Sequence, residues 1–196
     1  MKYVIFTFLF LLISCGQKDL EVTLPDQEIF SHDSLEVKIQ NNTNKDYLFF
    51  FEHNRLEYSE SSNSLEVIIT KNKKPVKSQL AIIDAFVIPD EDGYIDKKDS
   101  LEAAKFFDCS EHLIKVVPAK SHIMLKFLIL DEANRCGAGF FPEIKKNQFY
   151  ELKLKINTDT TLIKKEEMKQ INTHRKGKKI KLFQGQLESN TVKLNN

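Results

Sequence analysis

The chain has 196 residues, which suits one ordinary domain, and its 29 Lys/Arg against 28 Asp/Glu give a formal net charge of +1. That balance argues against a dedicated nucleic-acid binder, which usually carries a strongly basic domain. Hydrophobic residues make up 41% of the chain, enough for a core, whereas its 6 glycines leave little material for the phosphate-cradling loops of nucleotide-dependent enzymes.

The N-terminus carries the most specific signal. Tyr3 to Ile13 form an apolar stretch of 11 residues after Lys2, which is shorter than the roughly 20 residues of a bilayer-spanning helix and typical of a secretory signal peptide. The stretch ends in Leu12-Ile13-Ser14-Cys15, which resembles the lipobox of bacterial lipoproteins. The resemblance implies cleavage after Ser14 and lipidation of Cys15, with a non-lipidated signal peptide or a core strand as the alternatives.

The residue after the expected lipidation site bears on localisation. Position 16 is glycine rather than aspartate, so the usual signal for retention in the inner membrane is missing. The resemblance to lipoproteins therefore favours the outer membrane, with the domain at either the periplasmic face or the cell surface. The membrane is the first partner expected, through the anchor at Cys15.

From residue 20 onward, apolar and polar residues alternate. This period of two is typical of strands with one buried face, and turn-forming residues separate the runs at 41–44, 61–63, 118–121 and 157–159. The runs predicted to be strands have apolar faces formed by Leu35/Val37/Ile39, Tyr47/Phe49/Phe51, Leu65/Val67/Ile69, Leu80/Ile82 with Phe86/Ile88, Ile123/Leu125/Phe127/Ile129 and Leu152/Leu154/Ile156.

These short strands predict a mainly β fold, an antiparallel β-sandwich of the Ig-like type with one or two short helices. The runs LEVKIQNNTNKDYLFF, VPAKSHIMLKFLIL and FYELKLKIN resemble the Ig-like sandwiches of bacterial envelope proteins, including domains similar to BsuPI-type proteinase inhibitors. Tyr150, just before the last of these strands, is a candidate tyrosine corner. The predicted organisation is a signal peptide at 1–14, an anchor linker with the first strand at 15–33, and the β-sandwich domain at 34–196.

Two segments near or beyond the middle of the chain depart from this pattern. A capping-box pattern predicts a short helix over Leu101 to Phe107, and Thr161 to Ile171 is the second helix expected. The C-terminal region is predicted to end in a hairpin that pairs Lys179–Gln184 with Thr191–Leu194.

An acidic segment at 90–99 resembles the calcium loop of EF-hand and dockerin-like modules, because hard cations prefer clustered carboxylates around a sharp glycine turn. The candidate ligands are Asp90, Asp92, Asp96 and Asp99. Ile88 stands where the loop needs its first carboxylate, so a solvated acidic turn between strands is the favoured interpretation.

Catalytic motifs are missing from the sequence. The five histidines are scattered without the spacing of a metal site, and neither a GxSxG elbow nor a P-loop occurs. We therefore predict no catalytic residue, no cofactor and no enzymatic activity.

Charge is unevenly divided along the chain. The region from Lys145 onward holds 13 Lys/Arg against 5 Asp/Glu, densest at His174–Lys181. We interpret that cluster as a solvated entry to the C-terminal hairpin, and attraction to lipopolysaccharide phosphates or an acidic partner is the alternative.

Three Asp-Ser/Thr tripeptides match the acceptor pattern of a Gram-negative O-glycosylation system. They make Ser34, Ser100 and Thr160 candidate glycosylation sites. An Asx turn or a helix cap at each place is the alternative.

Lipidation of Cys15 leaves Cys109 and Cys136 in an oxidising compartment, where disulfides persist. If residues 112–117 and 122–130 pair about the 118–121 turn, the loop 131–139 brings Cys136 toward Cys109. We predict a disulfide between them that contributes about 3.5 kcal/mol on the chain-entropy model. Two buried free cysteines are the alternative.

The leading hypothesis for function is a non-enzymatic lipoprotein whose outer-membrane-tethered β domain presents a strand edge or loops to a protein or glycan partner. A proteinase inhibitor in the cell envelope is the alternative, resting on the fold resemblance alone. A hydrolase with a site assembled from scattered residues is the third hypothesis. No nucleic-acid partner is expected.

Overall fold

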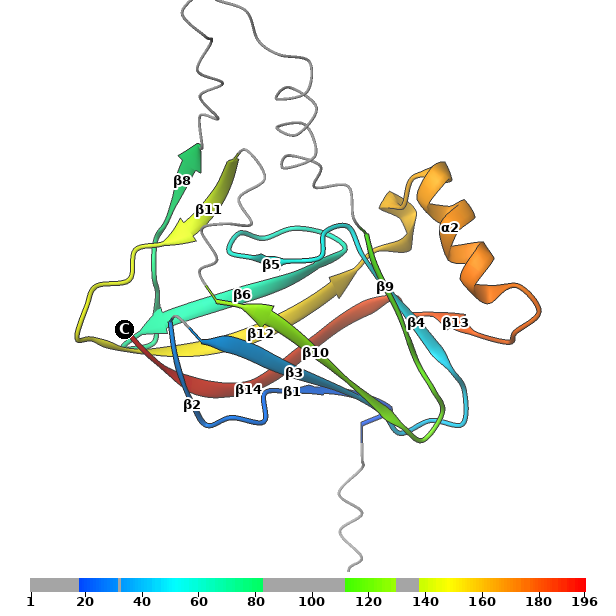
Figure 1. Ribbon diagram of the computed structural model, residues 1–196, viewed down its shortest axis with the longest axis horizontal. Helices are drawn as coiled ribbons and strands as arrows, with labels where there is room; N and C mark the ends of the chain where they lie inside the picture. The colour runs from blue at the N-terminus through cyan, green and yellow to red at the C-terminus, as the bar shows by residue number, and fades with distance from the viewer. Residues whose placement is uncertain (1–17, 32, 83–111, 130–137) are drawn as a thin grey trace, which may run out of the picture.

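The structure, a computed structural model, describes residues 18–31, 33–82, 112–129 and 138–196, without the side chains of 80–82 and 138–141. This part of the chain is mainly β with one α-helix (Figure 1), which confirms the predicted class at that level. Its elements are β1 (Leu20–Thr23), β2 (Glu28–Phe30), β3 (Ser34–Asn41), β4 (Tyr47–Phe51), β5 (Leu56–Glu57), β6 (Ser64–Lys71), β7 (Lys74–Pro75), β8 (Ser78–Ile82), β9 (Leu113–Val117), β10 (His122–Leu128), β11 (Ala138–Pro142), β12 (Phe149–Thr158), the 3-10 turn η1 (Thr160–Leu162), α2 (Lys165–Arg175), β13 (Lys181–Leu182) and β14 (Gly185–Asn195).

The largest sheet has the strand order β2-β14-β12-β6-β5, with β7 beside β6. β12 is antiparallel to both of its neighbours, and β2 joins the end of β14 in parallel. Leu152, Leu154 and Ile156 are fully buried on the inner face of β12, as their alternation predicted. The chain from 18 to 31 thus supplies two strands, one to each of two sheets, because β1 pairs with β3 instead.

A long bent ribbon packs against this sheet (Figure 1). One half of the ribbon pairs β3 with β10 and the other half pairs β4 with β9, both antiparallel. β3 leads into β4 through residues 42–46, and β9 leads into β10 through 118–121. Both strands of the ribbon therefore pass from one sheet to the next at the same corner.

β4 is buried on both faces, whereas its alternation predicted one buried face. Phe49 and Phe51 point into the main core. Leu48 and Phe50 point the other way and pack with Ile171 of α2 and with Ile180. The helix covers the outer face of this strand, so that face also needs apolar residues.

Two predicted strand pairings are wrong. Residues 112–117 and 122–130 do not form a hairpin, because the 118–121 turn is the ribbon corner and sends β9 to β4 and β10 to β3. Lys179–Gln184 and Thr191–Leu194 do not form one either. β13 lies parallel to β4, and β14 pairs with β12.

The helix expected at Thr161–Ile171 begins four residues later. The carboxylate of Asp159 accepts hydrogen bonds from Thr161 N (2.9 Å) and Oγ1 (2.7 Å), which stabilises the short 3-10 turn η1. The backbone then extends at Ile163 before α2 begins at Lys165. The other expected helix, Leu101 to Phe107, and the strand residues Phe86 and Ile88 lie outside the described residues.

Candidate functional site

A groove separates β1 from the first half of β14. It is lined by residues 18, 20–23 and 186–190 and has a volume of about 690 Å³, which is within the usual range of 300–1,000 Å³ for ligand sites. Among the described strands, β1 pairs only with β3, and residues 186–190 pair only with β12. The groove therefore lies between two unpaired strand edges.

The backbone of both strands directs polar groups into this groove. Leu24 turns its N–H and C=O away from β3, and the two-residue alternation of a strand directs those of Leu20 and Val22 the same way. On the other side, Leu154 directs its N–H toward β14. The next residue of β12, Lys155, therefore directs its backbone groups away from β14. Glu188 lies opposite Lys155, so the backbone groups of Glu188 point away from β12 and toward β1.

Asn190 closes one end of the groove. Its side chain accepts a hydrogen bond from Leu24 N (2.8 Å) and donates one to Leu24 O (3.0 Å), as a neighbouring strand would. A bulge places it there, because Ser189 and Asn190 together stand opposite the single residue Leu154. Ser189 Oγ accepts the Leu154 N–H at 2.9 Å. The bulge thus turns Asn190 sideways, a common use of an extra strand residue.

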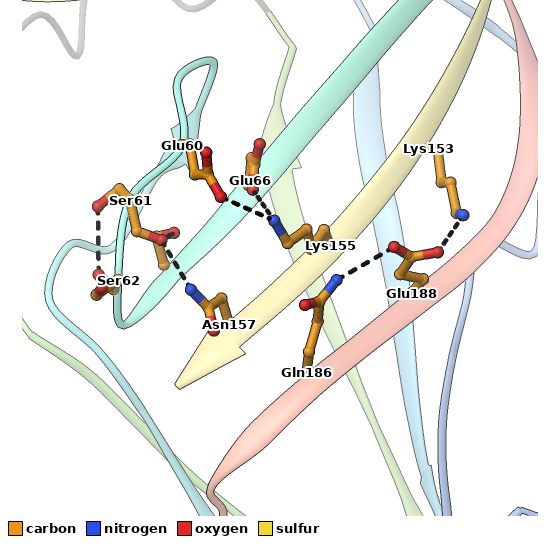
Figure 2. A network of polar contacts seen from close by, with 10 residues as sticks. Glu60, Ser61, Ser62, Glu66, Lys153, Lys155, Asn157, Gln186 and Glu188 are labelled. Carbon is orange, nitrogen blue, oxygen red and sulfur yellow. Dashed lines mark hydrogen bonds and ion pairs between the residues drawn. The ribbon is translucent and has the colours of Figure 1, made fainter. Parts of the chain in front are cut away.

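Charged side chains order the outer face of the sheet beside the groove (Figure 2). Lys155 lies 3.1 Å from Glu66 and 3.6 Å from Glu60, with its own side chain 14% exposed. Two residues earlier on β12, Lys153 pairs with Glu188 of the neighbouring strand β14, and Glu188 also accepts a hydrogen bond from Gln186 Nε2 at 3.2 Å. These contacts hold the side chains of Gln186 and Glu188 on the outer face of the sheet. The backbone edge of β14 stays turned toward β1.

Two pKa values on this face are shifted. The hydrogen bond to Glu66 raises the pKa of Lys155, against an opposing effect of desolvation, and the charges of Glu66 and Glu60 add to the increase. The hydrogen bond from Lys153 lowers the pKa of Glu188. Lys155 and Glu188 are therefore both held in their charged forms at neutral pH.

A second charged cluster lies at the start of α2. His112 donates from Nδ1 to Glu52 O at 2.9 Å, and its Nε2 is 3.8 Å from Glu167. Glu167 is 5% exposed and accepts the Lys164 N–H at 2.7 Å. Lys164 Nζ completes the cluster at 3.5 Å from Glu52 and 3.7 Å from Glu167. The cluster fastens the helix to the ends of β4 and β9.

Most predicted site residues lie outside the described part of the chain. They are the lipidation site Cys15, the disulfide candidates Cys109 and Cys136, the acidic loop residues Asp90, Asp92, Asp96 and Asp99, and the glycosylation candidate Ser100. The disulfide stays a prediction, but the hairpin used to argue its geometry is wrong. Within the described residues, no group of three or more His, Cys, Asp and Glu is arranged to hold a metal ion.

The other two glycosylation candidates stand beside aspartates that make local hydrogen bonds. Ser34 opens β3, next to Asp33, whose carboxylate accepts the Phe30 N–H at 3.2 Å. Thr160 opens η1, which Asp159 caps. Asp33 and Asp159 thus make the turn and cap contacts that the alternative interpretation expects. Glycosylation of Ser34 and Thr160 stays a prediction.

The basic cluster at His174–Lys181 spans the end of α2, a connection and the start of β13 rather than a hairpin entry. Arg175 Nε donates to Ile180 O at 2.9 Å, and the buried side chain of Ile180 anchors the connection against Leu48. The lysines between them are exposed.

The groove was not predicted, although one sequence signal for it exists. The apolar residues of the last strand fall at the odd position Leu187 and then at the even positions Val192 and Leu194. Such a change of parity within one strand requires an extra residue, and hence a bulge. Nothing in the sequence indicates that the bulged asparagine reaches β1.

Comparison with known proteins adds no relative. No protein-family model, no curated protein and no solved structure matches this chain. In the part that the structure describes, no helix is long and apolar enough to cross a bilayer.

Proposed function

We propose that this chain is a non-enzymatic lipoprotein of the outer membrane, anchored at Cys15, and that its β domain binds an extended segment of a protein partner in the groove between β1 and β14. The observation that carries the proposal is the pair of unpaired strand edges facing one another. An extended peptide gains main-chain hydrogen bonds on such an edge, and neighbouring pockets select its side chains.

The binding test uses two substitutions at one exposed position. Gln186 lies on the groove-facing register of β14. Gln186→Pro removes its N–H, and Gln186→Ala removes only the side chain. Random dodecapeptides displayed on phage are selected on the immobilised mature protein, and the enriched peptides are then measured against both variants. Binding falls at least tenfold with proline and stays within about twofold with alanine, since an edge strand is read through its backbone.

Equal binding to both variants, or no enriched peptide, contradicts the strand-edge site. Thermal unfolding of each variant confirms that the fold is kept. Glycans enriched in place of peptides on a carbohydrate array point to the other partner class considered for this domain.

The anchor has a test of its own. Cys15→Ala is expected to leave the chain unprocessed or to release it from membranes after an alkaline wash, because stable anchoring needs more than one acyl chain. The lipopeptide mass of the wild-type N-terminus is the direct measurement. Equal membrane fractionation of wild type and variant contradicts lipidation.

An Ig-like fold of residues 35–156, and with it a proteinase-inhibitor function, is the second candidate. Tyr150 supports it: the side chain is 4% exposed, and its hydroxyl accepts the Lys145 N–H at 2.9 Å, five residues upstream. This hydrogen bond resembles the one that a tyrosine corner makes to the backbone a few residues upstream. A panel of envelope proteases tests this function, and full protease activity at saturating protein contradicts it.

A further inference from the structure

Four exposed lysines surround the turn at 42–46, and we call them the basic corner: Lys18, Lys45, Lys120 and Lys181. Hydrogen bonds hold three of them to this turn. Asn42 Nδ2 donates to Lys18 O at 2.8 Å, Lys120 N donates to Thr43 O at 3.0 Å, and Lys181 N donates to Asp46 O at 2.9 Å. Lys45 belongs to the turn itself. Segments far apart in the sequence thus bring their positive charges together.

Acidic groups at this corner are fewer and partly occupied. Asp46 is half-buried, and its carboxylate accepts the Ala119 N–H at 2.8 Å. Asp19 is exposed beside Lys18. Lys178 and Lys179, which are also exposed, precede Lys181 along the chain and extend the positive surface. The balance of charge at the corner is therefore positive, although the chain as a whole is nearly neutral.

The corner lies close to the expected anchor. Lys18 is the third residue after Cys15, and an extended chain covers at most about 11 Å over that distance. Attraction between charges in solution extends over a Debye length of about 8 Å at physiological salt. Figure 1 shows both ribbon turns near the start of β1. A lipid on Cys15 therefore keeps Lys18 within about 11 Å of the anchor, which lets the basic corner approach the headgroups to within electrostatic range.

We propose that the basic corner docks on anionic phospholipid headgroups of the leaflet that holds the anchor, and so fixes the orientation of the domain. The inference rests on the proposed lipidation of Cys15. Lysine ammonium groups near an anionic surface attract it individually, and a basic patch strengthens the hold of a lipid anchor. The β6–β7 end of the large sheet, opposite the end where β14 begins, then faces away from the membrane.

The test is amine acetylation of the full lipidated protein, read by mass spectrometry residue by residue. The protein is reconstituted in vesicles of phosphatidylcholine alone or of phosphatidylcholine with phosphatidylglycerol. In the anionic vesicles, acetylation of Lys45, Lys120 and Lys181 is expected to slow at least about fivefold. The exposed Lys74 and Lys77, at the β6–β7 end, keep their rates. Salt at about 1 M, where the Debye length is about 3 Å, removes the protection.

Two matched double variants sharpen the result. Lys45→Glu with Lys120→Glu is expected to restore fast acetylation of Lys181 in anionic vesicles. Lys74→Glu with Lys77→Glu makes the same change of charge at the far end and leaves Lys181 protected. Thermal unfolding confirms that both variants fold.

The outcomes separate the two proposals. A lipidated chain whose corner lysines react equally fast in both vesicles overturns the docking alone. Protection that persists in the corner double variant also overturns it, because the charges are then not its cause. A wild-type N-terminus that carries no lipid overturns both the anchor and the docking.

Discussion

Asn41 fixes the corner of the ribbon. It is fully buried, and its Nδ2 lies within hydrogen-bond distance of the carbonyl oxygens of Lys45 (2.7 Å), Val117 (3.1 Å) and Pro118 (3.0 Å). Its Oδ1 accepts from Thr43 N (3.0 Å) and Oγ1 (2.8 Å). One side chain thus satisfies backbone groups on both strands where the ladder is interrupted.

We expect Asn41→Ala to lower the free energy of unfolding by about 2–3 kcal/mol, since it leaves several carbonyl oxygens at a buried bend without a donor. Asn42→Ala is the control, because Asn42 makes one exposed side-chain bond to Lys18 O and should cost less than about 1 kcal/mol. Urea denaturation of both variants measures the difference. Equal midpoints would show that the bend does not depend on Asn41.

Lys155 stands at the centre of the polar outer face in Figure 2. Lys155→Met leaves the carboxylate of Glu66, whose side chain is 12% exposed, without its cation. The expected loss of stability is about 2 kcal/mol at pH 8, between the values for exposed and fully buried pairs. Lys153→Met is the matched control, because its partner Glu188 is 45% exposed and such pairs contribute at most about 1 kcal/mol.

The same pair predicts a pH dependence. The pKa of Lys155 is raised above its ordinary value of 10.5 by the hydrogen bond to Glu66. The stabilisation is therefore fully present below pH 10.5 and is lost as the pH rises through the folded-state pKa. The difference in urea midpoint between wild type and Lys155→Met should stay constant up to about pH 10.5 and shrink above it, over the range in which the fold survives. A constant difference contradicts this assignment.

At the scale of elements, α2 is held by a small core of its own. Ile171 is fully buried with Leu48, Phe50 and Ile180, while the helix is otherwise mostly polar. The short 3-10 turn that precedes α2 is fixed by Asp159, so the helix starts where its apolar residue can reach β4. Packing, rather than helix propensity, therefore provides the stability of this element.

We expect Ile171→Ala to destabilise the protein by about 2–4 kcal/mol, because it opens a cavity in a well-packed site. Asn172→Ala changes the next residue, which is exposed, and should alter stability by less than about 0.5 kcal/mol. Thermal or urea unfolding checks both. A loss for Ile171→Ala no larger than that for Asn172→Ala would mean that α2 does not contribute to cooperative unfolding.

Across the whole molecule, early and late segments of the chain lie side by side. β2 pairs with the end of β14, Leu24 bonds to Asn190, and Ser31 N donates to Asn195 O at 2.9 Å. The ribbon likewise joins segments about 80 residues apart in sequence. Contacts between residues so far apart in sequence make folding depend on the last strand, β14, and lower the folding rate.

A chain that stops after Asn190 is therefore expected to lose cooperative unfolding. It lacks the buried Val192 and Leu194 and the only described strand that pairs with β2. Each lost core side chain alone costs about 1.5–3 kcal/mol, against a typical total of 5–15 kcal/mol. Circular dichroism during heating measures the transition, and Lys193→Ala, at an exposed position of the same strand, is the control. A sharp transition in the truncated chain contradicts this dependence.

The sequence by itself determined the β class, the inward faces of β3, β6, β10 and β12, and the positions of the turns, since a period of two specifies which side chains are buried. The sequence also contains the lipobox-like run Leu12–Cys15, on which the proposed localisation depends. Only the tertiary structure decided which strand lies beside which. Backbone donors and acceptors are the same in every strand, so periodicity cannot tell a hairpin at 118–121 from a corner between two sheets. Periodicity likewise could not predict three further features: the start of α2, the parallel pairing of β13, and the groove between β1 and β14. These depend on tertiary contacts around Phe49, Ile171 and Asn190.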